Sequence, residues 1–152
     1  MDWPADVLSI ILAVVFGAAI GLEREISGKA AGLRTNVLIC LGAAVFTIIS
    51  KRMGITANAS TTRIAAQIVT GVGFLGAGAI LQDRGGIHGL TTAATIWLVA
   101  SIGMASGAGF YTLAVISTFV AIVVLLGFGQ LEKPLQRYGR KHKRTSSTEQ
   151  QD

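Results

Sequence analysis

Uncharged apolar runs, separated by short polar clusters, make up most of the first 131 residues. Each run approaches the roughly 20 residues that a helix needs to cross the hydrocarbon core of a bilayer. The uncharged stretch 90–129 is too long for one span, and its glycine-rich segment 103–109 is the natural turn. The pattern predicts an all-α integral membrane protein with five transmembrane helices, at 7–22, 36–50, 64–82, 90–104 and 110–127.

The second and fourth predicted helices are short for membrane spans. A helix of 15 residues rises about 22 Å, less than the roughly 30 Å of a bilayer core. Three explanations stay open at this point: the helices extend past these boundaries, thin the bilayer locally, or are partly re-entrant.

The distribution of Lys and Arg predicts the direction of insertion. With the N-terminus outside, the inner segments carry 10 of these residues, and the outer segments carry only Lys51, Arg52 and Arg63. Cytoplasmic segments are enriched in basic residues, so we expect the N-terminus outside and the C-terminus in the cytoplasm. The acidic N-terminus has no basic region before the first apolar run, which indicates a retained helix rather than a signal peptide.

Composition supports a membrane protein and excludes other classes. Hydrophobic residues make up 51% of the 152-residue chain and charged residues 14%, against a usual ~25% charged. A soluble domain of this size cannot hide so much apolar surface, which excludes a water-soluble globular enzyme. The same composition excludes a disordered chain, and the single cysteine, Cys40, excludes an internal disulfide.

Charge is concentrated near the C-terminus, where residues 132–152 hold 9 of the 21 charged side chains. We therefore divide the chain into a transmembrane domain, 1–131, and a basic polar cytoplasmic tail, 132–152. We expect the tail to lie near anionic lipid and not to bind nucleic acid.

Glycines inside the predicted spans indicate close helix packing. Gly17 and Gly21 form a G-x-x-x-G pair, and Gly103 and Gly107 repeat that spacing. The third helix carries Gly71, Gly73, Gly76 and Gly78. Because membrane helices associate through small residues that let backbones approach, we expect the third helix at the centre of the bundle. Residues 71–76 also match G-x-G-x-x-G, but an apolar helix flanks them and no acidic residue follows at the required distance, so dinucleotide binding is rejected.

Acidic residues at the end of the first helix call for a compensating charge. Glu23 and Glu25 fall where the helix dipole disfavours anions. Lys29 lies four residues after Glu25, and Arg34 opens the second helix, so we expect these cations to reach the carboxylates. A solvated flank that neutralises its own charge is the alternative interpretation.

The loop before the fourth helix adds Asp83, Arg84 and His88 on the same predicted side of the membrane. We name the charged rim as the set of Glu23, Arg24, Glu25, Lys29, Arg34 and Asp83. Mg²⁺ takes oxygen ligands, normally including carboxylates. The rim could bind or sense a cation, but the sequence assigns no metal ligand, and no cofactor is expected.

Polar residues within the spans are few. Arg63 and Gln67 lie four apart at the start of the third helix, and a buried amide in lipid needs a partner. We expect Thr91 or Thr92 to cap the fourth helix and Trp97 to pack between helices. No Asp, Glu, Lys or His lies clearly inside a span, where ion-coupled transporters usually keep one. An ion path would have to use hydroxyls, amides and backbone carbonyls; its side chains would be Gln67, Thr70, Thr91 and Thr95.

Ordered sequence blocks across residues 5–128 resemble the MgtC/SapB family of bacterial inner-membrane proteins. The blocks are Glu-Arg-Glu at 23–25, Gly-Lys-Ala-Ala-Gly-Leu-Arg-Thr at 28–35, Arg-Ile-Ala-Ala-Gln-Ile-Val at 63–69, Gly-Val-Gly-Phe-Leu-Gly-Ala-Gly at 71–78, and Gly-Leu-Thr-Thr-Ala-Ala at 89–94 with Trp97. The resemblance implies a five-helix domain in the inner membrane and a role in adaptation to low Mg²⁺. In pathogens it implies survival inside host cells.

The sequence departs from the family pattern in two places. Ser60 and Thr61 stand where the family often has Asp-Pro, so no outer carboxylate role is carried over. Many members also have a soluble C-terminal domain where this chain has the segment 132–152, and functions of that domain are not carried over either.

Two functions follow as hypotheses. The first is a regulatory protein that binds another membrane protein through glycine-rich helix faces, with residues 23–34 and 83–88, which include the charged rim, as the cytoplasmic recognition or sensing surface. A homo-oligomer of the chain stays open as well. The second is a transporter or channel for Mg²⁺ or another ion. An enzyme is not expected, because His88 and His142 lack acidic partners at a recognisable spacing.

Overall fold

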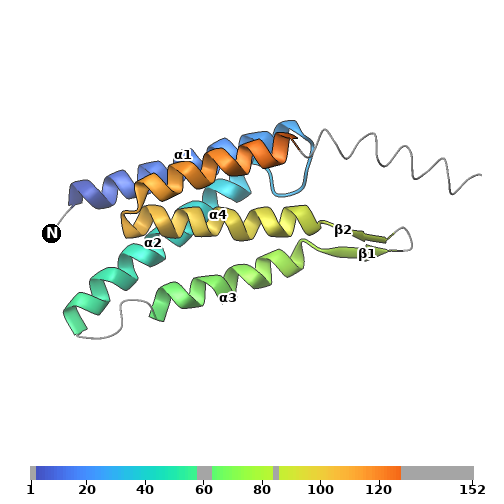
Figure 1. Ribbon diagram of the computed structural model, residues 1–152. Helices are drawn as coiled ribbons and strands as arrows, with labels where there is room; N and C mark the ends of the chain where they lie inside the picture. Colours follow the sequence, from blue (N-terminus) through green and yellow to red (C-terminus); the bar gives the residue numbers. More distant parts are fainter. Residues whose placement is uncertain (1–2, 58–62, 84–85, 128–152) are drawn as a thin grey trace, which may run out of the picture.

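The computed structural model describes residues 3–57, 63–83 and 86–127, which form a bundle of helices with one small β-hairpin (Figure 1). The labelled helices are α1 (Trp3–Ile26), α2 (Leu33–Ala57), α3 (Arg63–Gly78) and α4 (Leu90–Ala108). A further helix, Tyr111–Gly127, is drawn in orange without a label, and we call it the C-terminal helix. The strands are β1 (Leu81–Asp83) and β2 (Gly86–His88). The predicted all-α class is confirmed apart from this hairpin.

Two helices end in the same glycine-dependent way. After α1, Gly28 has a φ of 62°, its N–H donates to Glu25 O, and the Lys29 N–H donates to Arg24 O. After α4, Gly109 has a φ of 89°, and its own N–H and that of the next residue make the same pair of bonds. Such left-handed glycine caps satisfy carbonyls that a helix end leaves unpaired.

Helix α2 lies between α1 and α4, and glycines on both neighbours face it. A Cβ on Gly17 of α1 would lie 2.9 Å from Asn36 O of α2. On the other side, a Cβ on Gly103 or Gly107 of α4 would overlap backbone oxygens of α2. Both α4 glycines therefore lie inside the helix, and the turn predicted over 103–109 is confined to Gly109. The prediction was wrong because these glycines pack rather than bend the chain.

Helix α3 lies at the edge of the bundle and not at its centre as predicted (Figure 1). A Cβ on Gly71, Gly73 or Gly78 would meet nothing within 4 Å, and one on Gly76 would make only ordinary contacts with Ala93. A helix rich in glycine allows a neighbouring helix to come close. Which of its glycines are in contact depends on where the neighbouring helix lies. Here α2 and α4 share the central position: α4 contacts α1, α2 and α3, and α2 presents Cys40, Ala43 and Ala44 to its neighbours.

The chain between α3 and α4 forms the hairpin where we expected only a loop. Leu81 pairs with His88, Gln82 with Ile87 and Asp83 with Gly86 in an antiparallel register. Helix α3 accordingly ends at Gly78 and not near residue 82. The hairpin extends past the ends of the helices (Figure 1).

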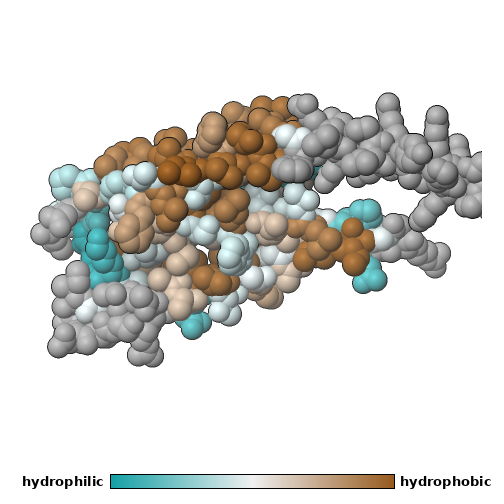
Figure 2. Space-filling view, in the orientation of Figure 1, coloured by the Kyte–Doolittle hydropathy of each residue, from teal (hydrophilic) through white to brown (hydrophobic). Residues whose placement is uncertain are grey.

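Three described helices are long and apolar enough to cross a membrane: α1, α2 over Leu33–Gly54, and α4. Ala65–Gly78 and the C-terminal helix are shorter apolar helices. Helix α2 extends past both predicted boundaries, and its 25 residues rise about 37 Å. Of the three explanations for the short predicted span, the one in which the helix extends beyond 36–50 is therefore correct. Hydrophobic side chains cover much of the outer surface (Figure 2), as expected of a bundle whose solvent is lipid. Five spans and the direction of insertion remain predictions.

Candidate functional site

The connection between α1 and α2 and the hairpin lie at the same end of the bundle (Figure 1). The described parts of these two segments, 23–34 and 81–83 with 86–88, thus lie at the same end of the bundle (Figure 1), as the prediction that they share one side of the membrane requires. The side chains of Asp83 and Arg63 lie outside the described residues, as do Arg84, the departure at Ser60 and Thr61, and the tail 132–152.

Glu25 caps the second helix. Its Oε2 accepts a hydrogen bond of 3.0 Å from the backbone N–H of Leu33, the first residue of α2. The carboxylate thus lies at the unfavourable end of one helix dipole and at the favourable end of another. The carboxylate also covers Gly32, where a Cβ would overlap Oε2.

The cations expected to reach Glu25 do not do so in the part of the chain that the structure describes. Helix α1 ends at Ile26, so the i, i+4 geometry that would join Glu25 to Lys29 is lost. Arg34 lies in the first turn of α2 with its side chain exposed, and Lys29 is exposed as well. Both cations therefore face outward, where a partner can reach them.

Glu23 and Arg24 form a buried ion pair beside this cap. Arg24 Nη1 lies 3.7 Å from Glu23 Oε2, and the two side chains are 4% and 8% exposed. Ser27 Oγ donates to Glu23 Oε1 at 2.8 Å. Among the described residues, Glu23 Oε2 and Arg24 Nε have no hydrogen-bond partner. Burying ions is costly unless their hydrogen bonds are complete, so these two atoms leave the pair under-satisfied.

Asn36 is a buried polar residue that the sequence analysis did not single out. Its Nδ2 donates to Gly32 O at 2.9 Å and also to Ala31 O, while Oδ1 is buried without a described partner. It packs against Gly21, one turn before Arg24 on α1. The available signal was an amide at the first residue of an apolar run, where burial requires a hydrogen-bond partner.

The opposite end of the bundle holds a second ion pair that the sequence analysis also missed. Arg52 of α2 donates to the Asp6 carboxylate of α1, and its guanidinium lies 5.3 Å from the ring centroid of Trp3. The sequence did contain a signal for this contact. An acidic residue and a tryptophan lie in the first turn of α1, and two basic residues lie near the end of α2. Cation–π and ionic contacts together join the two helices at this end.

The predicted polar residues of the spans fall in different places. Gln67 and Thr70 are exposed on α3, and Thr92 is buried in α4. Neither Thr91 nor Thr92 caps α4, because Gly89 takes that position with a φ of 87°. A Cβ on Gly89 would overlap Ala79 O, so the close approach of α3 selects glycine there.

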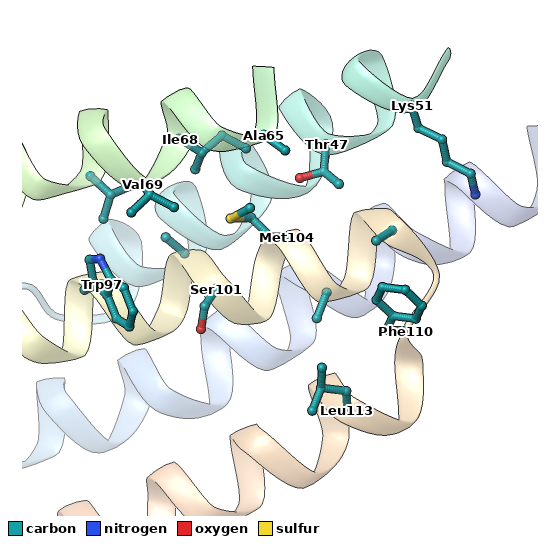
Figure 3. A pocket seen from close by; sticks show the side chains of 14 residues that line it. Thr47, Lys51, Ala65, Ile68, Val69, Trp97, Ser101, Met104, Phe110 and Leu113 are labelled. Carbon is teal, nitrogen blue, oxygen red and sulfur yellow. The ribbon is translucent and has the colours of Figure 1, made fainter. Parts of the chain in front are cut away.

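Trp97 is 53% exposed and does not pack between helices as predicted. It lines an open groove of about 600 Å³ between α3 and α4 (Figure 3). The helical period places this side chain on the outer face of α4, whereas Thr95, Ile96 and Val99 are buried.

The proposed ion path is not assembled within the described residues. Gln67 lines a groove between α2 and α3, whereas Thr91 and Thr95 line another between α4 and the C-terminal helix. The Thr95 hydroxyl donates to Thr91 O at 2.8 Å and is thereby occupied. Within residues 3–57, 63–83 and 86–127, no three His, Cys, Asp or Glu side chains lie close enough to hold a metal ion.

Comparison with the sequences of known proteins identifies the family of this chain. YhiD of Escherichia coli K12, named "Putative magnesium transporter YhiD", is 48% identical over 135 residues, which cover 82% of this chain and 61% of YhiD. The protein MgtC of Brucella abortus is 45% identical, covering 74% of this chain and 46% of MgtC. SrpB of Synechococcus elongatus is 38% identical, covering 87% of this chain and 79% of SrpB.

The chain spans about half to three fifths of the length of most of these curated relatives. No solved structure shows a significant match. A sequence model of the MgtC family matches residues 10–134, which include every described helix from α2 onward and most of α1. The resemblance found in the ordered motifs is therefore confirmed, and this membrane protein belongs to the MgtC family.

Proposed function

We propose that the chain supports bacterial growth at low Mg²⁺ from the inner membrane, by binding and regulating another membrane protein. The charged rim is the recognition surface. One observation carries this proposal: Gln67 lines one groove and Thr91 and Thr95 line another, while the exposed cations Lys29 and Arg34 stand at one end of the bundle. This distribution favours contact with a partner over conduction through the chain.

The names of the relatives support the link to magnesium. The relatives include MgtC and a protein whose printed name is "Putative magnesium transporter YhiD". By the same likeness, the proposed role extends in pathogens to survival inside host cells.

A growth assay tests the rim. In a strain that needs the protein at low Mg²⁺, the double variant Lys29→Gln/Arg34→Gln should lose rescue while its level in the membrane stays unchanged. Both side chains are exposed and neither forms an ion pair with a described residue, so their loss should leave the fold intact. The double variant Lys29→Arg/Arg34→Lys keeps both positive charges, so it should keep rescue and serves as the matched control. Full rescue by the double variant would contradict the rim as the recognition surface.

Transport of Mg²⁺ is the second candidate, because the name of YhiD refers to it. Mg²⁺ flux into proteoliposomes decides between the two functions, with empty vesicles as control and the orientation of the protein checked. No flux from inserted protein supports regulation. Saturable flux would overturn regulation, and in that case Gln67→Leu should lower the flux because Gln67 is the amide on α3.

A further inference from the structure

The groove that Trp97 lines runs along the bundle between helices that follow one another in the chain. Its walls come from α2, α3, α4 and the start of the C-terminal helix (Figure 3). Ile68 and Val69 of α3 lie on one side, and Trp97 and Met104 of α4 on the other. It is open along its length and holds about 600 Å³, which is the size of a small-molecule site.

The walls of the groove offer almost no free polar group. Thr47 Oγ1 donates to Ala43 O at 2.7 Å, and Ser101 Oγ donates to Leu98 O at 2.7 Å. Both hydroxyls are therefore already hydrogen-bonded within their own helices. An occupant that matches these walls is mostly hydrocarbon, because the lining side chains are predominantly apolar and the two hydroxyl protons are already used.

One end of the groove carries a cation. Lys51 is the charged residue among the described lining residues, and its side chain is exposed. It forms no ion pair with a described residue, whereas the neighbouring Arg52 pairs with Asp6. The matching ligand therefore has an anionic head at this end and an apolar chain along the groove.

The length of the groove suits a lipid chain. Along α4 the lining runs from Trp97 to Ala108, a rise of about 16 Å, which is close to the depth of one leaflet of a roughly 30 Å core. An acyl chain that starts beside Lys51 can therefore follow the groove as far as Trp97 (Figure 3).

We propose that the groove binds an acyl chain of an anionic phospholipid, whose phosphate pairs with Lys51. The inference rests on the membrane location within the proposed function, but not on regulation or transport. Trp97 lies at the far end of the groove from Lys51 and reports on the bound chain.

Fluorescence quenching tests the site in the full chain. The chain has two tryptophans, so Trp3→Phe leaves Trp97 as the single reporter and keeps an aromatic ring beside Arg52. The protein is reconstituted with phosphatidylglycerol or phosphatidylcholine brominated in the distal half of the acyl chains. Half-maximal quenching should need an at least 3-fold lower mole fraction of brominated phosphatidylglycerol. Lys51→Gln should abolish this preference, and Lys29→Gln, a charge loss at the other end of the bundle, should keep it.

Equal quenching by the two lipids, or a preference that survives Lys51→Gln, would overturn the proposal. Weak quenching by both lipids that strengthens as the protein is diluted would instead show a second copy covering the groove, which also overturns it. Insertion is checked separately by protease accessibility of the vesicles. Failure to insert would refute the membrane location itself and is distinguishable from a loss of lipid preference in inserted protein.

Discussion

Glu25 lies at the last turn of α1, yet the group that its carboxylate binds belongs to α2. An anion at a helix C-terminus is unfavourable, and the exposed N–H groups of the next helix offset that effect. Gly32 makes the contact sterically feasible, because a side chain there would occupy the space of the carboxylate. Residues of the rim therefore have different roles. Glu25 stabilises the start of α2, whereas Lys29 and Arg34 face outward.

Glu25→Ala should lower the free energy of unfolding by about 1 kcal/mol, the usual cost of losing a helix cap. Glu25→Gln should cost less, because its amide oxygen can still accept the Leu33 N–H. Chemical or thermal unfolding of the purified protein in detergent measures the difference. Equal stability of wild type and Glu25→Ala would contradict the cap.

Gly32→Ala should also destabilise the protein, by displacing the Glu25 carboxylate from the helix end. The double variant Glu25→Ala/Gly32→Ala should then lose less stability than the two single losses together, because both act on one contact. A double-mutant cycle in the same detergent measures this coupling. Strict additivity would show that Gly32 acts independently of Glu25.

Helices are the next scale, and here the position of a glycine decides its role. Gly103 lies against the α2 backbone, whereas Gly73 of α3 faces open space, although both are glycines inside apolar helices. Close approach on both sides explains why α2 occupies the middle of the bundle. The open face of α3 leaves that helix at the edge, beside the groove proposed to hold lipid.

Gly103→Ala should cost about 1–3 kcal/mol of stability, because the added methyl overlaps Cys40 O and forces α2 and α4 apart. Gly73→Ala is the matched control and should keep or slightly raise stability, because its Cβ meets nothing within 4 Å and Ala favours a helix more than Gly. Unfolding by SDS titration in mixed micelles compares the two. Similar losses for both variants would contradict the central position of α2.

At the scale of the whole molecule, the helices separate two charged ends. One end carries the connection between α1 and α2 with the hairpin, and the other carries the contact of Asp6, Arg52 and Trp3. The excess of Lys and Arg on the first side predicts that it faces the cytoplasm.

Reporter fusions check this topology. Alkaline phosphatase fused after residue 60 should be active, because the predicted topology places that connection outside, and fused after residue 84 it should be inactive. A fluorescent reporter that folds only in the cytoplasm should give the opposite pattern. Activity of the phosphatase at both positions would contradict the predicted orientation.

The sequence alone determined what depends on composition and period. Apolar runs predicted the helices because each backbone must satisfy its own hydrogen bonds in lipid, and the ordered motifs identified the family. The sequence also predicted that residues 23–34 and 81–88 lie on the same side of the membrane, because successive spans alternate in direction.

The tertiary structure decided which partner each residue meets. The four glycines on α3 and the two on α4 cannot be distinguished from the sequence. Only the two on α4 lie in close contact with the backbone of α2. Glu25 binds the helix that follows and not a cation nearby in sequence. Trp97 lines a groove because the helices around it leave space on that side. These outcomes depend on how whole helix surfaces fit together, and that fit is a property of the assembled bundle rather than of any one segment.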